Sequence, residues 1–176
     1  GWMHLAGNLL FLWIFGDNLE EEMGHLGFLV FYLAAGLAAG LGQMLPDLGS
    51  TVPMIGASGA IAGVMGGYLL LFPRAKVDVL VIIFIFLRIF AIPAWIVLGL
   101  WFVLQVFSGY ATPMDGGGVA YWAHAGGFLA GLVLTLPVWR RRGARRYWQA
   151  TEGHPPHPET DFAAARSSVP LIRRRR

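Results

Sequence analysis

The chain has 176 residues, of which 56% are hydrophobic and 13% are charged, and its formal net charge is +3. A water-soluble domain of this length could not bury so many apolar side chains, because a small domain leaves much of its surface in water. The absence of cysteine excludes disulfide bonds and thiolate metal sites.

The apolar residues are grouped in blocks of about 20 residues, which is the length of helix that crosses a bilayer. The blocks cover roughly residues 2–19, 26–45, 57–72, 91–108 and 120–139. They predict an all-α fold, a polytopic helical membrane bundle with five transmembrane helices. Because the chain opens on Gly1 almost inside the first block, we expect one upstream span of a six-helix bundle to be missing.

Two further segments are less regular than these blocks. Residues 77–90 are apolar but carry Asp78 and Arg88, so they are either an interfacial segment or the start of a long, tilted fourth block. Residues 140–176 are rich in Arg and Pro and predict a basic anchor at the membrane surface followed by a disordered tail. The chain therefore divides into a transmembrane domain, residues 1–139, and a cytoplasmic tail.

The basic residues predict the orientation through the positive-inside rule. Ten of the 13 lie at or beyond Arg140, and Arg74 and Lys76 lie between the third and fourth blocks. The segments 46–56 and 108–119 contain no Lys or Arg and are predicted to lie outside. We therefore expect a cytoplasmic C-terminus, and the clustered charge gives no reason to expect a nucleic-acid partner.

Four polar side chains lie near the starts of apolar blocks. His4 and Asn8 open the first block, Ser58 opens the third, and His124 lies near the start of the fifth. These blocks cross the membrane in the same direction, so all four side chains are predicted at a similar shallow depth below the outer surface. Polar groups inside a membrane are costly and by default indicate a functional site. A hydroxyl, a histidine base and two further hydrogen-bond donors suggest nucleophilic chemistry.

Glycines on two of these blocks predict which helices pack together. Gly59 and Gly63 are four residues apart on one block, and Gly127 and Gly131 repeat the spacing on another. Small residues at this spacing let helix backbones approach closely, which would bring the hydroxyl and the imidazole within hydrogen-bond distance. Ser58 also opens a helix, where unpaired N–H groups and the helix dipole favour an oxyanion.

Each of these residues also has a purely structural interpretation. Ser58 could be a helix N-cap, the most common role of serine at a helix start. His124 could bond to a carbonyl at the interface, His4 could lie among the headgroups, and Asn8 could join two helices. The glycines could serve packing alone. A metal site formed by the two histidines and Asn8 is disfavoured, because zinc sites normally have three or four nitrogen, sulfur or carboxylate ligands.

Taken together, the motifs and their order resemble those of the rhomboid intramembrane serine proteases. The matching elements are His-x-x-x-Asn at His4 and Asn8, Gly-x-Ser-Gly at residues 56–59, Ala-His-x-x-Gly at residues 123–127, and a Gly…Glu…Gly signature at Gly16, Glu20 and Gly24. The resemblance covers about residues 1–139. Family members often carry a Tyr four residues after the serine, packed on the histidine, whereas this chain has Ala62.

The resemblance implies that Ser58 is the nucleophile and His124 the general base of a catalytic dyad. His4, Asn8 and the backbone N–H of Ser58 would form the oxyanion hole, with no cofactor or metal. The substrates would be transmembrane proteins that enter sideways from the lipid bilayer and are cut near the outer face. We expect a multi-pass protein of a bacterial plasma membrane.

Two other classes of protein stay open at this point. A non-catalytic rhomboid-like protein would bind membrane helices without cutting them. A transporter or channel would need a polar path through the whole membrane, whereas the inner halves of the blocks hold almost no ionisable groups.

Overall fold

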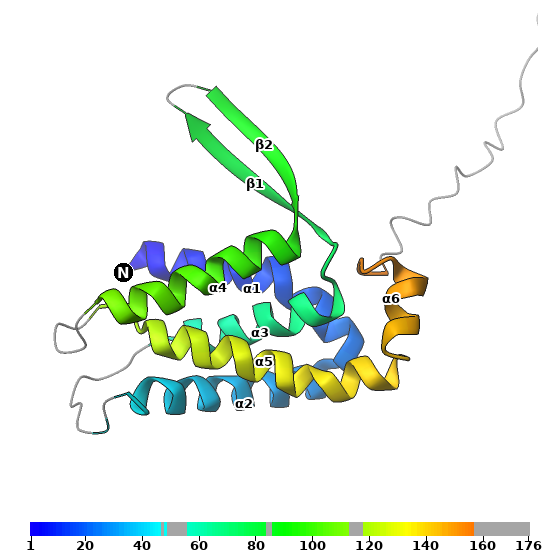
Figure 1. Ribbon diagram of the computed structural model, residues 1–176, viewed down its shortest axis with the longest axis horizontal. Coiled ribbons are helices and arrows are strands. Elements are labelled where there is room, and N and C mark those ends of the chain that lie inside the picture. Colours follow the sequence, from blue (N-terminus) through cyan, green and yellow to red (C-terminus); the bar gives the residue numbers. More distant parts are fainter. Residues whose placement is uncertain (47, 49–55, 84–85, 113–117, 157–176) are drawn as a thin grey trace, which may run out of the picture.

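The helices run roughly side by side, and a two-stranded hairpin projects from one flank of the bundle (Figure 1). The computed structural model describes residues 1–46, 48, 56–83, 86–112 and 118–156. In chain order the elements are α1 (Trp2–Met23), α2 (His25–Met44), α3 (Ser58–Leu71), β1 (Lys76–Ile83), β2 (Phe86–Pro93), α4 (Ala94–Ala111), α5 (Tyr121–Arg141) and α6 (Arg145–Thr151).

Helices α2, α4 and α5 are long and apolar enough to cross a membrane. Helix α1 has 22 residues, but it continues past the predicted end of its block through Glu20, Glu21 and Glu22. It ends where Gly24 adopts a positive φ of 73°, which glycine tolerates best, and α2 begins at the next residue. Three of the five predicted blocks are therefore membrane spans by length and composition in the described part of the chain.

Helix α3 is the centre of the bundle and is shorter than its block predicted. Its 14 residues span only about 21 Å at 1.5 Å per residue, against about 30 Å of hydrocarbon in a bilayer. It contacts α1, α2, α4 and α5, and all but three of its residues are buried. The helix fits there because glycine and alanine dominate its first half, so the neighbouring helices can approach on every side.

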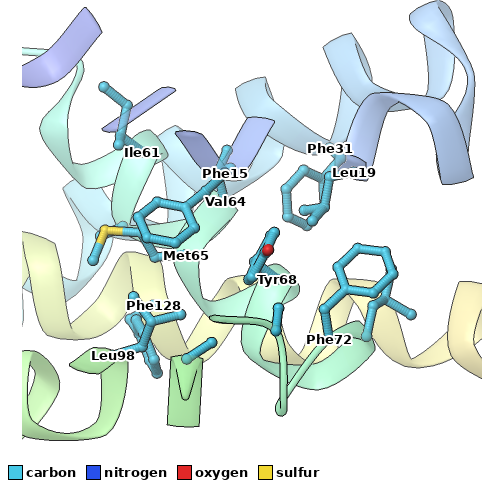
Figure 2. Packing of buried hydrophobic residues seen from close by; sticks show 14 of the residues in the cluster. Phe15, Leu19, Phe31, Ile61, Val64, Met65, Tyr68, Phe72, Leu98 and Phe128 are labelled. Atoms are coloured by element: carbon cyan, nitrogen blue, oxygen red, sulfur yellow. The ribbon is translucent and has the colours of Figure 1, made fainter. Parts of the chain in front are cut away.

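The hydrophobic core is built around α3 (Figure 2). The ring of Tyr68 lies edge-on to Phe15 of α1, with 5.0 Å between ring centroids, and to Phe72, with 5.2 Å. Leu98 of α4 and Phe128 of α5 belong to the same buried cluster. One apolar core therefore joins helices that are far apart in the sequence.

The segment at 77–90 is not the start of a long fourth helix, because it forms two strands. Strands β1 and β2 form an antiparallel hairpin in which Lys76 pairs with Pro93 and Ile83 with Phe86. The β-branched residues of this stretch favour strands. Pro93 ends the hairpin and is the N-cap of α4, so α4 begins at Ala94, three residues later than its block predicted.

The chain after α5 differs from the tail that the sequence predicted. Helix α6 folds back beside the bundle, and its Tyr147 and Trp148 pack against the core cluster. The Trp148 ring N–H donates to the backbone oxygen of Leu70 at 2.9 Å. Aromatic side chains thus fix α6 against the bundle, although the Arg and Pro content of residues 140–176 predicted a disordered tail. Residues 157–176 lie outside the described part of the chain.

A buried carboxylate anchors α6 to α1. The Tyr147 hydroxyl donates to Glu22 Oε1 at 3.0 Å, and Arg142 Nε lies 2.7 Å from Glu22 Oε2. Burial and the neighbouring Glu22 raise the pKa of Tyr147, so its hydroxyl keeps the proton that it donates. These contacts join the far end of α1 to the end of α5 and the start of α6.

Helices α3 and α5 are in direct backbone contact at glycine. A Cβ built on Gly127 would strike the carbonyl oxygen of Gly59, and one built on Gly131 would strike the carbonyl oxygen of Gly63. Gly66, which the sequence analysis did not single out, meets the backbone of α5 in the same way. No larger residue fits at these positions while the two helices keep their separation.

We predict that Gly131→Ala destabilises the bundle by about 2 kcal/mol, because overpacking a tight contact typically costs 1–3 kcal/mol. The matched control is Gly99→Ala on α4, where an added Cβ has no neighbour within 4 Å. Alanine is the better helix former, so this control should be neutral or stabilising by up to about 1 kcal/mol. Thermal unfolding of both variants in the same detergent measures the difference, and equal stabilities would contradict the backbone contact.

Candidate active site

A cavity of about 1320 Å³ opens at the end of the bundle where α3 and α5 begin. Its walls come from the first half of α1, much of α2, the first residues of α3 and α5, and Trp101 and Gly109 of α4. All four polar residues singled out in the sequence line it, namely His4, Asn8, Ser58 and His124.

The structure places the side chains of Ser58 and His124 within hydrogen-bond distance. Ser58 Oγ and His124 Nε2 are 2.8 Å apart. Ser58 is the first residue of α3 rather than its N-cap, which is Ala57, and no side-chain hydrogen bond caps the helix. The structural alternative of a capping serine therefore does not describe this residue.

The position of His124 follows from how the first turn of α5 is held. The backbone N–H of Ala123 donates to Gln43 Oε1 of α2 at 3.0 Å. Gly42 of α2 also lies against Gly126, with no side chain between the two backbones. Helix α5 is thus fixed between α2 and α3 at the level where His124 meets the serine.

Helix α4 supplies two contacts to the imidazole that the sequence analysis missed. The ring of Trp101 lies 5.8 Å from that of His124, between centroids, and tilted by 33°. Gln105 Oε1 lies 2.8 Å from His124 Nδ1. These two side chains that contact the His124 ring therefore come from α4. In the sequence motif of the family, a Tyr often packs on this ring from the position that Ala62 of α3 occupies here. One sequence signal could have identified these two residues. Leu98, Trp101 and Gln105 recur at helical spacing, which places all three on one face of α4.

His4 and Asn8 lie on the α1 side of the same cavity and also line a smaller cavity of about 330 Å³. Among the described residues no hydrogen bond joins either side chain to Ser58 or His124. The His4 ring lies beside Gly56, where an added Cβ would be 3.3 Å from His4 Cε1. Gly56 has a φ of 142°, a backbone conformation that favours glycine, and a larger residue here would push against the His4 ring.

The cavity has a largely apolar lining in which a few polar side chains converge, and its described side chains carry no carboxylate, ammonium or guanidinium group. None of the described residues that line it is Asp, Glu, Lys or Arg. The described part of the chain also contains no group of three His, Cys, Asp or Glu residues that could hold a metal ion. The helix ladder of α3 starts with the bond from Ile61 N–H to the Ala57 oxygen, which leaves the Ser58 N–H outside the ladder. A hydroxyl beside a histidine at a helix N-terminus is an arrangement suited to acyl transfer.

The fold and the site first define the class of protein, which is an integral membrane protein with a helical bundle and, at one end, a cavity that contains a serine and two histidines. The family model of the Rhomboid domain matches residues 1–141. The chain therefore belongs to the rhomboid family, as the sequence motifs predicted.

Several curated relatives match the chain over part of their length. It is 33% identical to Rhomboid protein 1, mitochondrial, of Saccharomyces cerevisiae over 137 residues, which are 74% of this chain and 36% of the relative. It is 45% identical to Rhomboid-like protein 11, chloroplastic, of Arabidopsis thaliana over 62 residues, which are 35% of this chain and 22% of the relative. It is 44% identical to Rhomboid protease GluP of Bacillus subtilis over 69 residues, which are 39% of this chain and 13% of the relative.

The chain thus spans less than half the length of each of these relatives. No solved structure matches it. Because the relatives include a mitochondrial and a chloroplastic protein, family membership does not support the bacterial plasma membrane that we expected from the sequence.

Proposed function

We propose that this protein is an intramembrane serine endopeptidase in which Ser58 is the nucleophile and His124 the general base. The observation that carries the proposal is the 2.8 Å separation of Ser58 Oγ and His124 Nε2 in a cavity of a rhomboid-family membrane protein. The name of the Bacillus subtilis relative, a rhomboid protease, supports the same reaction class.

The reaction would proceed in two acyl transfers. His124 Nε2 takes the hydroxyl proton as Ser58 Oγ attacks the peptide carbonyl, and the proton then passes to the departing amine as the C–N bond breaks. A water molecule next gives a proton to Nε2 and attacks the acyl ester. The ester C–O bond breaks, the new carboxyl product leaves, and Ser58 recovers its proton.

The oxyanion formed in each transfer would be held by neutral donors. The Ser58 N–H, at the positive end of the α3 dipole, is one donor. His4 and Asn8 would supply two more from α1, because residues four apart share a helix face and both line the cavity. Donors of this kind stabilise charge that develops only during the reaction.

The substrate we propose is a transmembrane helix that enters sideways from the bilayer beside α4 and is cut near the outer face. Helix α4 presents a broad apolar surface to lipid, with Trp95, Leu100 and Phe107 each more than half exposed. A helix hides its peptide bonds in internal hydrogen bonds, so the substrate must unwind locally before Ser58 can reach a carbonyl. In this arrangement all of α1 to α5 would be embedded in the membrane, with the short α3 enclosed by the others.

We predict that Ser58→Ala and His124→Ala each abolish cleavage of a transmembrane substrate, because each removes a group that takes part in bond making. The measurement is a gel assay with the reconstituted chain and a generic single-span substrate. Ser108→Ala on α4 and His25→Ala at the start of α2 are matched controls, since neither residue lines the cavity. Cleavage that survives Ser58→Ala would refute the proposed function. Substrate binding without any cleavage by the unaltered chain would instead favour a non-catalytic binder.

We predict that His4→Ala and Asn8→Ala lower kcat with little change in KM. Loss of one oxyanion donor typically costs about 10²–10³ in rate. Asn8→Asp tests the donor directly, because it keeps the shape of the side chain but removes its NH₂ group, and it should be impaired like Asn8→Ala. Variants that raise KM while kcat stays unchanged would show that these residues bind substrate rather than stabilise the oxyanion.

We predict that the site faces the outside and α6 the cytoplasm, as the placement of Lys and Arg indicates. The chain contains no cysteine, so single cysteines can be labelled without background. An impermeant maleimide should label Leu48→Cys on intact cells, and Gln149→Cys of α6 only after the membrane is opened; both native residues are exposed in the bundle. The reverse pattern would overturn the orientation and with it the position of the cut.

A further inference from the structure

We infer that Gln105 of α4 is a positioning residue for His124, and that its amide oxygen holds the imidazole in the one neutral tautomer that can act as a base. The inference rests on the proposed function of the site and adds a third residue to it. It comes from a single contact, the 2.8 Å separation between Gln105 Oε1 and His124 Nδ1.

The tautomer matters because the two ring nitrogens have different tasks. Nε2 lies 2.8 Å from Ser58 Oγ and must be unprotonated to accept the hydroxyl proton. A neutral imidazole has one proton, so that proton must be on Nδ1. The hydrogen bond made by one ring nitrogen decides which tautomer is populated. Because a carbonyl oxygen only accepts, Gln105 Oε1 requires the N–H to be on Nδ1.

Gln105 acts from behind the ring and not from within the cavity. His124 lines the cavity, whereas Gln105 is not among its lining residues and is half-buried between α4 and α5. It therefore touches the base but not the space that a substrate would fill. This separates Gln105 from His4 and Asn8, which line the cavity itself.

The face of α4 that carries Gln105 is held against α5 by aromatic packing. Phe102 stacks on Phe128 with 4.9 Å between centroids. One turn beyond the amide, Gly109 lies against the ring of Trp122. These contacts lie on either side of Gln105 along α4, so the amide has a defined height relative to the imidazole. Trp101 beside the ring further limits how far the imidazole can tilt.

A neutral amide suits this position better than the carboxylate found in soluble serine proteases. In those enzymes a buried aspartate bonded to the other ring nitrogen holds the tautomer. A carboxylate at membrane depth would carry a large desolvation cost, and the described lining of the cavity holds no cation to offset it. An amide oxygen accepts the same hydrogen bond without a charge.

The direct test reads the tautomer and does not depend on cleavage. In the full chain labelled with ¹⁵N-histidine, the His124 resonances, identified by their loss in His124→Ala, should show a protonated Nδ1 and an unprotonated Nε2. In Gln105→Met, which keeps the length but removes the acceptor, the Nε2–H tautomer should become populated. Gln105→Glu retains an acceptor and should keep the proton on Nδ1. A native chain with its proton on Nε2, or no change in Gln105→Met, would overturn the inference.

Kinetics separate this role from simple packing. Gln105→Met should lower kcat by about 10-fold or more with KM unchanged, since a general base contributes about 10²–10⁴ in rate and only its alignment is impaired. Gln105→Glu should recover most of the rate, and Leu37→Met, at an exposed position of α2 outside the cavity lining, should match the native chain. Native kcat in Gln105→Met, with Ser58→Ala inactive, would refute the role of Gln105 and leave the proposed function standing. Cleavage by Ser58→Ala would refute the proposed function instead.

Discussion

Backbone contact between α3 and α5 is the constraint on which the site depends. Gly127 lies on the carbonyl of Gly59, next to Ser58, and His124 is one turn before Gly127. Lipid offers little hydrophobic drive for helix association, so the fit of the two backbones provides the attraction. The same contact that stabilises the centre of the bundle therefore sets the distance between the hydroxyl and the imidazole.

The candidate site consists of neutral groups, which suits the proposed position of the site within a membrane. Charges are expensive at membrane depth unless they are paired, whereas an amide, an imidazole or a helix N-terminus can polarise a reacting group at lower cost. Ser58 opens α3, and Gln105 meets the ring of His124 from α4. The buried carboxylate of Glu22 and its half-exposed partner Arg142 lie at the opposite end of the bundle, where the pair anchors α6 and is remote from the cavity.

Much of the helical fold could be predicted from the sequence because hydrophobic blocks and helix lengths are local properties. The blocks at 26–45 and 120–139 agree with α2 and α5 to within two residues. The hairpin at β1 and β2 was missed, because a short apolar stretch fits a strand or a helix equally well by periodicity. Helix α6 was missed because its Arg-rich composition indicated a solvent-exposed tail. Its two aromatic residues stabilise a helix only by packing against the core, and that contact is not visible in the local sequence.

The residues of the candidate site could be predicted from the sequence, whereas the contacts between them were decided by the tertiary structure. The order of the blocks and the spacing of motifs were enough to single out Ser58, His124, His4 and Asn8, since intramembrane polar groups are rare and stand out. Family membership followed from the same motifs. Gln105 could not be predicted as a partner of His124, because it is one of several polar residues in apolar blocks. Whether its side chain reaches His124 depends on which face α4 turns toward α5. That direction is decided by long-range packing of Phe102 on Phe128 and Gly109 on Trp122, which no local pattern contains.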